Sequence, residues 1–307
     1  MIILGGILGV LMAGMMVDVS ALTSQRSDGD DDDDIPAPED EDSESLPPTM
    51  PEPPDHQPDE SVIDGSDGLD FLMGTPGDDL IRGHGGADDL RGGLGDDTIE
   101  AGSGDDWVQG DAVYGPGGDD LIYGGEGDDL LAGQGGDDML FGEDGDDTLM
   151  GGEGDDSLFG GEGDDVLAGH EGDDLLVSTG GTDDLDGGAG NDVLIGHDGP
   201  ETVWMNGGDG NDTLMPGAHD FASGNGGDDT FILRQVAEGF PTLADFNGDH
   251  DQIVLHLDAQ IARDAQLSLR EDGDGSVLLE VNGQAVGRLL NAEALRLGDV
   301  RIVAIGG

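Results

Sequence analysis

The sequence of 307 residues has no cysteine, only 9 lysines and arginines, and 4% aromatic residues. The lack of cysteine excludes a disulfide scaffold and a thiolate metal site. Glycine contributes 60 residues, and so many glycines with so few rings cannot fill an ordinary core of large side chains. A common globular enzyme fold is therefore not expected.

Positive charge is scarce, whereas aspartate and glutamate together number 72, which gives a formal net charge of -63. Self-repulsion at this density opposes a compact state unless cations bind, so the composition indicates either bound metal or disorder. Nucleic acid and anionic membrane surfaces are poor partners because they would repel a polyanion, and no nucleic-acid partner is expected.

Two segments of unusual composition come first in the chain. Residues 1–17 are uninterruptedly apolar, which is short for a membrane span and typical of the apolar region of a signal peptide. For residues 1–19 a cleaved signal and a membrane anchor both stay open, and the acidic block after them favours a body outside the cytoplasm. Residues 20–62 are rich in Asp, Glu, Pro and Ser, which predicts a disordered linker.

A repeat with a period of nine residues runs from Gly65 to Ile232. Residues 151–159 read GGEGDDSLF and residues 160–168 read GGEGDDVLA, which is the signature of a solenoid. Position eight of the unit is almost always aliphatic. Position six is acidic, and its aspartates are Asp70, Asp79, Asp88, Asp97, Asp106, Asp120, Asp129, Asp138, Asp147, Asp156, Asp165, Asp174, Asp183, Asp192, Asp212 and Asp229.

The period is disturbed in three places. Residues 110–114 are extra, and we expect them to bulge out or to divide the solenoid into two parts. Further on, the alignment places Glu201 at position six and Val203 at position eight, with an insertion at residues 205–206. One later unit is degenerate and carries Phe221 at position six.

Each unit combines a glycine-rich turn of six residues with an extended segment of three. Because strand side chains alternate, position eight points inward and positions seven and nine point outward. We predict two units per coil and two parallel sheets, so that Asp156 lies beside Asp174. Carboxylates and backbone carbonyls of adjacent turns then form an oxygen cage that suits Ca²⁺ better than Mg²⁺. No Lys or Arg lies between Gly92 and Leu233, so we expect this region to fold only with metal bound.

The unit GGxGxDxUx resembles the calcium-binding nonapeptide of RTX (repeats-in-toxin), hemolysin-type proteins. The resemblance covers residues 65–232, about half of the chain. It implies an all-β fold, a parallel β-roll that binds several calcium ions between its turns through turn carbonyls and the position-six aspartates given above. It also implies a secreted protein that is exported by type I secretion machinery. The acidic residues at position five, such as Asp155, are interpreted as outward-facing charge.

Ordinary β patterns replace the glycine period in residues 234–307. The pair Asp245-Phe246 and the strand starting at Asp251 resemble the segment that follows the last repeat of RTX proteins. A solenoid needs an end unit over its last apolar rung, so this region is predicted to be a β-rich cap, and by resemblance it holds the secretion signal. The predicted domains are thus 1–19, 20–62, a β-roll at 63–233 and the cap at 234–307; strands are expected at 267–270, 276–281, 284–289 and 300–305.

No catalytic residues are expected. His170-Glu171 lacks the second histidine of a zinc protease motif, and no serine lies in a G-x-S-x-G elbow. An enzyme confined to residues 234–307 is disfavoured because so short a segment leaves little room for a pocket. We therefore expect an extracellular calcium-binding protein with a structural or cell-surface role and an unknown surface or matrix ligand. The alternative is a calcium-dependent adhesin or another surface-recognition module. Trp107 at position seven and Trp204 at position nine could contribute to such a surface, although local packing also explains them.

Overall fold

A computed structural model of the chain describes residues 61–112, 117–235, 239–292 and 295–305. All of these residues belong to one compact unit. The apolar segment 1–19 and nearly all of the predicted linker, up to residue 60, lie outside the described residues. Within the part that is described, no helix is both long and apolar enough to cross a membrane.

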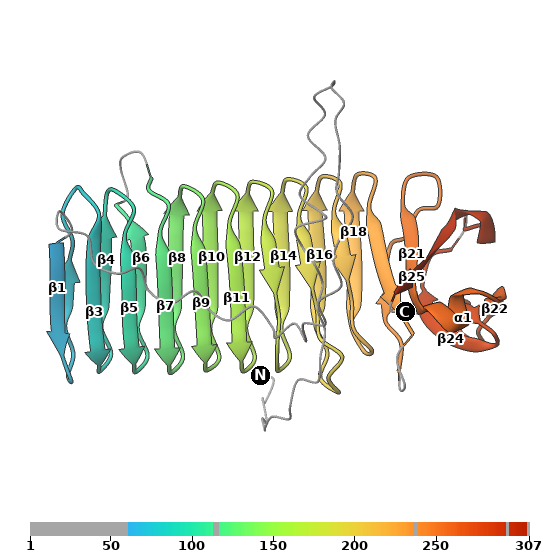
Figure 1. The fold of residues 1–307 in the computed structure, drawn as a ribbon, viewed down its shortest axis with the longest axis horizontal. Coiled ribbons are helices and arrows are strands. Elements are labelled where there is room, and N and C mark those ends of the chain that lie inside the picture. Colours follow the sequence, from blue (N-terminus) through green and yellow to red (C-terminus); the bar gives the residue numbers. More distant parts are fainter. Residues whose placement is uncertain (1–60, 113–116, 236–238, 293–294, 306–307) are drawn as a thin grey trace, which may run out of the picture. The chain divides into compact units, whose positions relative to one another are not determined.

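Two mainly parallel sheets make up the unit, and successive strands alternate between them (Figure 1). Each coil therefore uses two nonapeptide units, as the sequence predicts. Sheet A contains, in order, β1 (Ser61–Ser66), β3 (Asp79–Gly85), β5 (Thr98–Ser103), β7 (Leu121–Glu126), β9 (Met139–Asp144), β11 (Ser157–Glu162), β13 (Leu175–Val177), β15 (Val193–Ile195), β17 (Thr213–Met215), β19 (Thr230–Arg234), β21 (Gln252–Asp258) and β25 (Val300–Ile305).

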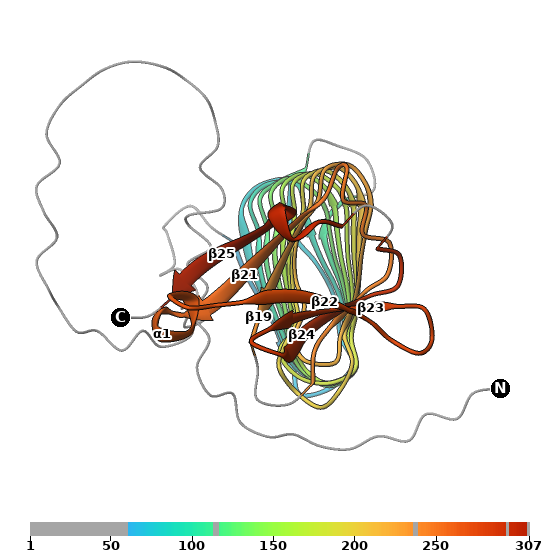
Figure 2. The same cartoon turned by 90° about the vertical axis from the view of Figure 1, so that its right-hand side faces the viewer.

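Sheet B lies opposite and continues into the cap. It contains, in order, β2 (Phe71–Met73), β4 (Asp89–Gly93), β6 (Trp107–Asp111), β8 (Leu130–Gly135), β10 (Thr148–Glu153), β12 (Val166–Glu171), β14 (Asp184–Ala189), β16 (Trp204–Asp209), β18 (Phe221–Gly226), β20 (Thr242–Leu243), β24 (Gln284–Leu289), β23 (Val277–Val281) and β22 (Leu267–Glu271). When the roll is viewed along its axis, successive coils lie over one another (Figure 2).

The core of the roll is a ladder of one aliphatic side chain per unit. Leu149 pairs with Leu167 in sheet B, and Leu158 pairs with Leu176 in sheet A, so position eight stacks on position eight. From Ile81 to Leu194 these side chains are at most 1% exposed. The alternation of side chains along a strand thus gives the inward rung that was predicted.

Glycine is sterically required at position four of the turn. Gly154 has a φ of +131°, and a Cβ at this residue would collide with the carbonyl oxygen of Gly136 one coil earlier. The close approach of backbone to backbone therefore excludes a side chain here. Position two adopts positive φ in many units, and five of the described residues that do so carry side chains: His84, Gln134, Glu143, His170 and Asn225.

The alignment expected around Glu201 is wrong by two residues. Trp204 pairs with Asp184, which is at position seven, so Val203 takes position six. Trp204 is therefore at position seven, and the extra residues lie in the turn that precedes it, whereas the prediction put them at 205–206. Strand residues are fixed by ladders on both neighbours, and a turn can absorb additional residues more easily.

The next unit is corrected in the same way. Phe221 pairs with Trp204 and is thus at position seven, which puts Asp220 at position six. The unit is one residue short, and its shortening again falls in the turn. Phe221 does not occupy a metal-binding position.

The extra residues near Gly110 do not divide the roll. Gly110 and Asp111 belong to β6, where Asp111 pairs with Gly93. Sheet pairing continues past this point from β5 to β7 and from β6 to β8. The additional residues therefore follow Asp111 in the connection to β7, of which residues 113–116 lie outside the described ranges, and the expected division of the roll is wrong.

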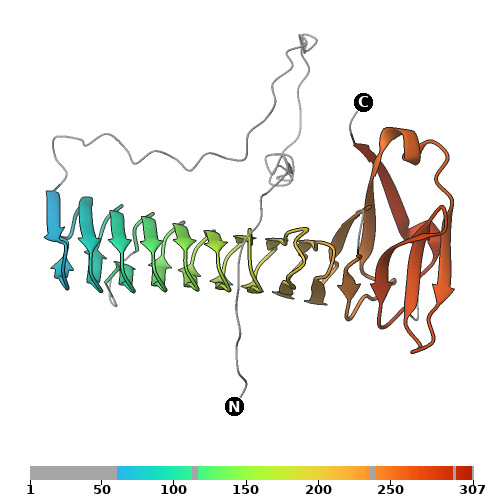
Figure 3. The same cartoon turned by 90° about the horizontal axis from the view of Figure 1, so that it is seen from below.

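A β-rich cap closes the C-terminal end (Figure 3). In sheet B the antiparallel strands β22, β23 and β24 follow β20, and in sheet A β25 pairs with β21. Phe246 is 3% exposed and packs edge-on against Phe231 of the last repeat, with 6.1 Å between ring centroids. The predicted strands are present, together with one short helix α1 (Ala259–Ala262) and a 3-10 helix η2 (Leu297–Asp299).

Candidate metal centre

Position-six residues form two rows along the roll, one on each side. Row A lies in the turns that lead into sheet A and contains Asp79, Asp97, Asp120, Asp138, Asp156, Asp174, Asp192, Asp212, Asp229 and Asp251. Row B lies in the turns that lead into sheet B and contains Asp70, Asp88, Asp106, Asp129, Asp147, Asp165, Asp183, Val203 and Asp220. All sixteen predicted aspartates are in these rows.

Within a row, each carboxylate binds the backbone of the preceding coil. The N–H of Asp138 donates to Oδ1 of Asp156 at 2.8 Å, and the N–H of Asp147 donates to Oδ1 of Asp165 at 2.9 Å. In row A this pattern continues without a break from Asp79 to Asp251. The carboxylates are therefore held in register by the same stacking that builds the sheets.

The second carboxylate oxygen is left without a partner. In Asp79 this oxygen is Oδ1. In twelve further described aspartates it is Oδ2: Asp88, Asp97, Asp106, Asp120, Asp129, Asp138, Asp147, Asp156, Asp165, Asp174, Asp192 and Asp212. A buried carboxylate oxygen without a hydrogen-bond partner is costly, so its repetition in coil after coil fits a site that holds a cation.

The surroundings of that oxygen fit a hard cation. At Gly142, in position one, a Cβ would lie against both Oδ2 of Asp147 and the carbonyl oxygen of Gly160 in the next coil. Glycine thus leaves space where a carboxylate oxygen and a backbone carbonyl face each other. Oxygen ligands of this kind and irregular geometry suit Ca²⁺, which would neutralise the carboxylates when bound. No group of three or more His, Cys, Asp or Glu side chains converges as a metal site within the described ranges.

Burial makes the charged form of these carboxylates unfavourable. It raises the pKa of Asp120 to about 9 and that of Asp156 and Asp165 to about 8, against the opposing effect of the hydrogen bond from the preceding coil. Neighbouring aspartates add a smaller upward shift of the pKa. A bound cation would reverse this preference by stabilising the ionised form.

Aspartates at position five occupy the outer rim of the turns. Asp155 is exposed, and its N–H donates to Oδ1 of Asp137 at 2.9 Å. The same bond recurs between Asp164 and Asp146 at 2.8 Å. These side chains point to solvent. The buried oxygens that face each other in the turn come from the position-six carboxylate and from a backbone carbonyl, and not from position five.

Two members of the rows were missed by the sequence analysis. Asp220 is fully buried in row B, and Asp251 of row A accepts the N–H of Asp229 at 3.2 Å. Counting back nine residues from the intact unit at Asp229 would have identified Asp220. The first members also differ from the rest, because Asp70 accepts from Ser66 and Asp79 accepts from the N–H of Thr75.

A family model agrees with this geometry. The family model of the RTX calcium-binding nonapeptide repeat (4 copies) matches residues 64–99, 91–112, 114–149, 141–176, 177–214 and 203–218, which together make up half of the chain. No curated protein matches the chain. Among solved structures, it is similar to the extracellular lipase LipA from Serratia marcescens, with 20% identity and a TM-score of 0.19.

That similarity covers 76% of this chain and 40% of the lipase, so the chain spans well under half of the lipase's length. RTX repeat proteins bind calcium and are generally secreted. With its two aspartate rows in a parallel β-roll, this chain belongs to the family of RTX calcium-binding nonapeptide repeat proteins.

Proposed function

We propose that this protein is a calcium-dependent extracellular scaffold whose roll folds when calcium neutralises the two aspartate rows. The observation that carries this proposal is the set of thirteen buried carboxylate oxygens in the described rows that have no hydrogen-bond partner. The role is structural, at the cell surface or in the surrounding matrix, and involves no catalysis. Export would use type I secretion machinery.

The distribution of positive charge supports metal as the neutralising partner. The arginine ion pairs lie toward the ends of the described roll and in the cap, for example Arg82 with Glu100 at 2.9 Å and Arg270 with Glu280 at 2.7 Å. Between Gly92 and Leu233 the sequence offers no Lys or Arg. The buried aspartates of the middle coils therefore depend on protons or on cations from solution.

Titration of the full chain tests this proposal. We expect little β structure by circular dichroism in the presence of a chelator, and a cooperative gain of β structure when Ca²⁺ is added. Mg²⁺ should be much less effective because it requires stricter octahedral geometry. Equal β content with chelator and with calcium would refute the proposed role of the metal.

A second candidate function, adhesion, is favoured by an exposed aromatic pair on sheet B. Trp204 is 49% exposed and stacks on Phe221, with 4.4 Å between ring centroids. Beside it, the amide of Asn206 donates to Asp186 at 2.8 Å. An aromatic face next to amide and carboxylate groups is suited to a sugar ring, and the net negative charge favours neutral over acidic polysaccharides.

Binding to immobilised neutral polysaccharide in the presence of calcium tests the adhesin alternative. Trp204→Ala should abolish retention, whereas Thr148→Ala, which changes position seven of β10 in the same sheet, should leave it intact. Equal retention of both variants would rule out the aromatic pair as the contact.

A further inference from the structure

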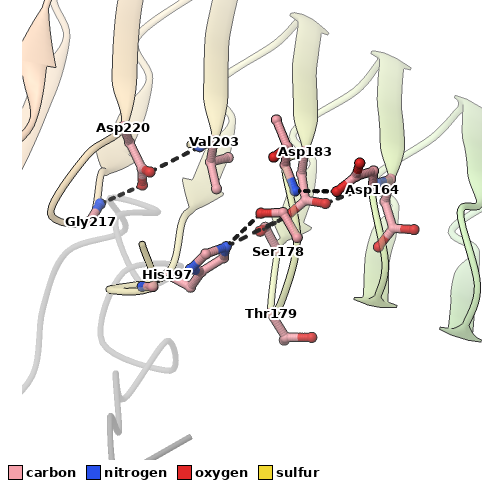
Figure 4. A network of polar contacts seen from close by, with 12 residues as sticks. Asp164, Ser178, Thr179, Asp183, His197, Val203, Gly217 and Asp220 are labelled. Carbon is pink, nitrogen blue, oxygen red and sulfur yellow. Dashed lines mark hydrogen bonds and ion pairs between the residues drawn. The ribbon is translucent and has the colours of Figure 1, made fainter. Parts of the chain in front are cut away.

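Three consecutive turns of row B depart from the pattern that suits a cation. They comprise residues 178–183, 196–203 and 216–220, and they are stacked next to one another near the cap end of the roll (Figure 4). The buried oxygens without partners in row B end at Asp165, whereas in row A they continue to Asp212. In each of the three turns, a specific residue explains why row B has no buried carboxylate oxygen without a partner.

In the first turn a serine hydroxyl binds the carboxylate oxygen that has no partner in the preceding turns of the row. Ser178 occupies position one, where the preceding turn of row B has Gly160. Its hydroxyl donates to Oδ2 of Asp183, and the N–H of Asp165 donates to Oδ1 of the same carboxylate at 2.9 Å. Both oxygens of Asp183 are therefore hydrogen-bonded within the protein.

A buried histidine reaches into the same place from the second turn. Nδ1 of His197 accepts the N–H of Gly199 at 2.8 Å, so the ring hydrogen is on Nε2, which lies 3.0 Å from the carbonyl oxygen of Gly181. Nε2 is 4.0 Å from Oδ2 of Asp183. The imidazole is 8% exposed, and it points at the serine and the carboxylate in Figure 4. The imidazole thus binds the carbonyl oxygen of Gly181 and fills the space beside Asp183.

The second and third turns also lack a carboxylate oxygen that is free to bind a cation. Val203 puts an apolar side chain at position six, so the second turn offers no carboxylate. In the third turn Oδ1 of Asp220 accepts the N–H of Val203 at 3.0 Å, and Oδ2 accepts the N–H of Gly217 at 2.6 Å. Asp220 is fully buried, yet neither of its oxygens is free.

We infer that the calcium sites of row B end at Asp165, and that Ser178, His197 and Gly217 replace the cation in the last three turns with hydrogen bonds. Asp183 then leaves the predicted ligand set although its position in the repeat is that of a ligand. On the same coils, row A still has buried carboxylate oxygens without a hydrogen-bond partner. At this end of the roll, the side of row A therefore binds calcium, whereas the side of row B is held together by hydrogen bonds alone. This inference rests on the proposed calcium-dependent function.

The number of calcium ions bound per full chain, measured by equilibrium dialysis, tests it with two matched variants. Asp165→Asn and Asp183→Asn change the same position of one row, 18 residues apart, and asparagine keeps the Oδ1 acceptor in both. Asp165→Asn should bind one ion fewer than the wild type, and Asp183→Asn should bind the same number as the wild type. Loss of an ion from Asp183→Asn would overturn the inference. Unchanged binding in both variants would overturn the proposed function of the rows as well.

A second pair of variants tests the replacement itself and does not alter any carboxylate. Gly160→Ser introduces at the Asp165 turn the hydroxyl that Ser178 provides one coil later. Gly160 has no positive φ, but its new Cβ would press on Oδ2 of Asp165, so that carboxylate must shift as the side chain enters; Gly160→Ala adds the same Cβ without the hydroxyl and is the control for this crowding. We expect Gly160→Ser to lose one ion, while Ser178→Gly loses none. A Gly160→Ser protein that folds and keeps every ion would contradict replacement of the cation by a hydroxyl.

Discussion

The backbone N–H of Asp156 donates to Oδ1 of Asp174 at 2.8 Å, and these two residues are 18 positions apart in the chain. Oδ2 of Asp174 is buried beside this bond and has no partner. One carboxylate therefore serves two purposes, because it binds the preceding coil directly and leaves an oxygen for a cation. Metal binding and the stacking of coils are coupled through the same side chain.

Replacement of Asp156 with Ala should remove one calcium ion and loosen the adjacent coils. The N–H of Asp138 would lose its acceptor in a buried position, which costs about 1–3 kcal/mol of unfolding free energy. Urea unfolding in saturating calcium, together with calorimetric titration, measures both effects.

Asp155→Ala is the matched control for this change. Asp155 is exposed, and water can replace its hydrogen bonds, so the unfolding free energy should change by no more than about 0.5 kcal/mol. If the two variants were equally destabilised, the distinction between buried and outer aspartates would be wrong.

The regular part of this fold could be predicted from the sequence because each coil repeats the contacts of the coil before it. The aliphatic rung, the two sheets and the pairing of Asp156 with Asp174 all follow from the period and from the alternation of strand side chains. The alignment failed at Val203 and Asp220, where residues had been added to or lost from turns. A pattern counted forward carries such an error into the next strand, whereas a strand paired on both sides cannot shift.

The closed turns of row B could not have been predicted in the same way. Asp183 fits the repeat at position six. Its turn differs in sequence from that of Asp165 in having Ser178 in place of Gly160, but the bond from Ser178 to the carboxylate and the proximity of His197 are seen only in the structure. His197 lies in a lengthened turn that no period describes, so its direction depends on the three-dimensional course of that turn.

Position four should tolerate no side chain. Gly154→Ala would force a Cβ against the carbonyl oxygen of Gly136 at a φ that L-residues disfavour by about 1–2 kcal/mol before the collision is counted. We expect a loss of unfolding free energy of at least this size in calcium, measured by urea unfolding. Gly135→Ala is the control, since its nearest atoms would be 3.9 Å away, and it should be neutral or slightly stabilising.

In the presence of a chelator, the roll should gain structure as the pH falls. Burial raises the pKa of Asp120 to about 9 and that of Asp156 to about 8, whereas an unfolded aspartate has a pKa of about 3.9. Between these values the folded state binds more protons than the unfolded state, so its stability is greatest at low pH and is lost as the pH rises through the folded pKa. The β signal in chelator should therefore be larger at about pH 5 than at about pH 8.

Calcium should reverse that dependence. Its binding displaces the protons of the buried aspartates, so the apparent calcium affinity should rise between about pH 5 and pH 8. Circular dichroism in chelator and calorimetric titration at several pH values give the two curves. A β signal that increases with pH in chelator would contradict the raised pKa values of the rows.

One residue in a strained backbone conformation offers a route to a more stable roll. His170 is exposed at position two with a φ of +85°, and its neighbours at this position in sheet B are Gly152 and Gly188. A left-handed conformation costs an L-residue about 1–2 kcal/mol, while glycine loses about 0.5–1 kcal/mol through the greater freedom of the unfolded chain. His170→Gly should thus raise the unfolding free energy by about 0.5–1 kcal/mol.

The adjacent Glu171→Gly isolates the conformational origin of that gain. Glu171 is also exposed, but it has no positive φ, so only the entropic cost applies and the variant should lose about 0.5–1 kcal/mol. Urea unfolding of both variants in saturating calcium measures the two changes. Because the side chains are both exposed and adjacent in β12, opposite signs can come only from the backbone conformation at position two, and equal signs would exclude strain there.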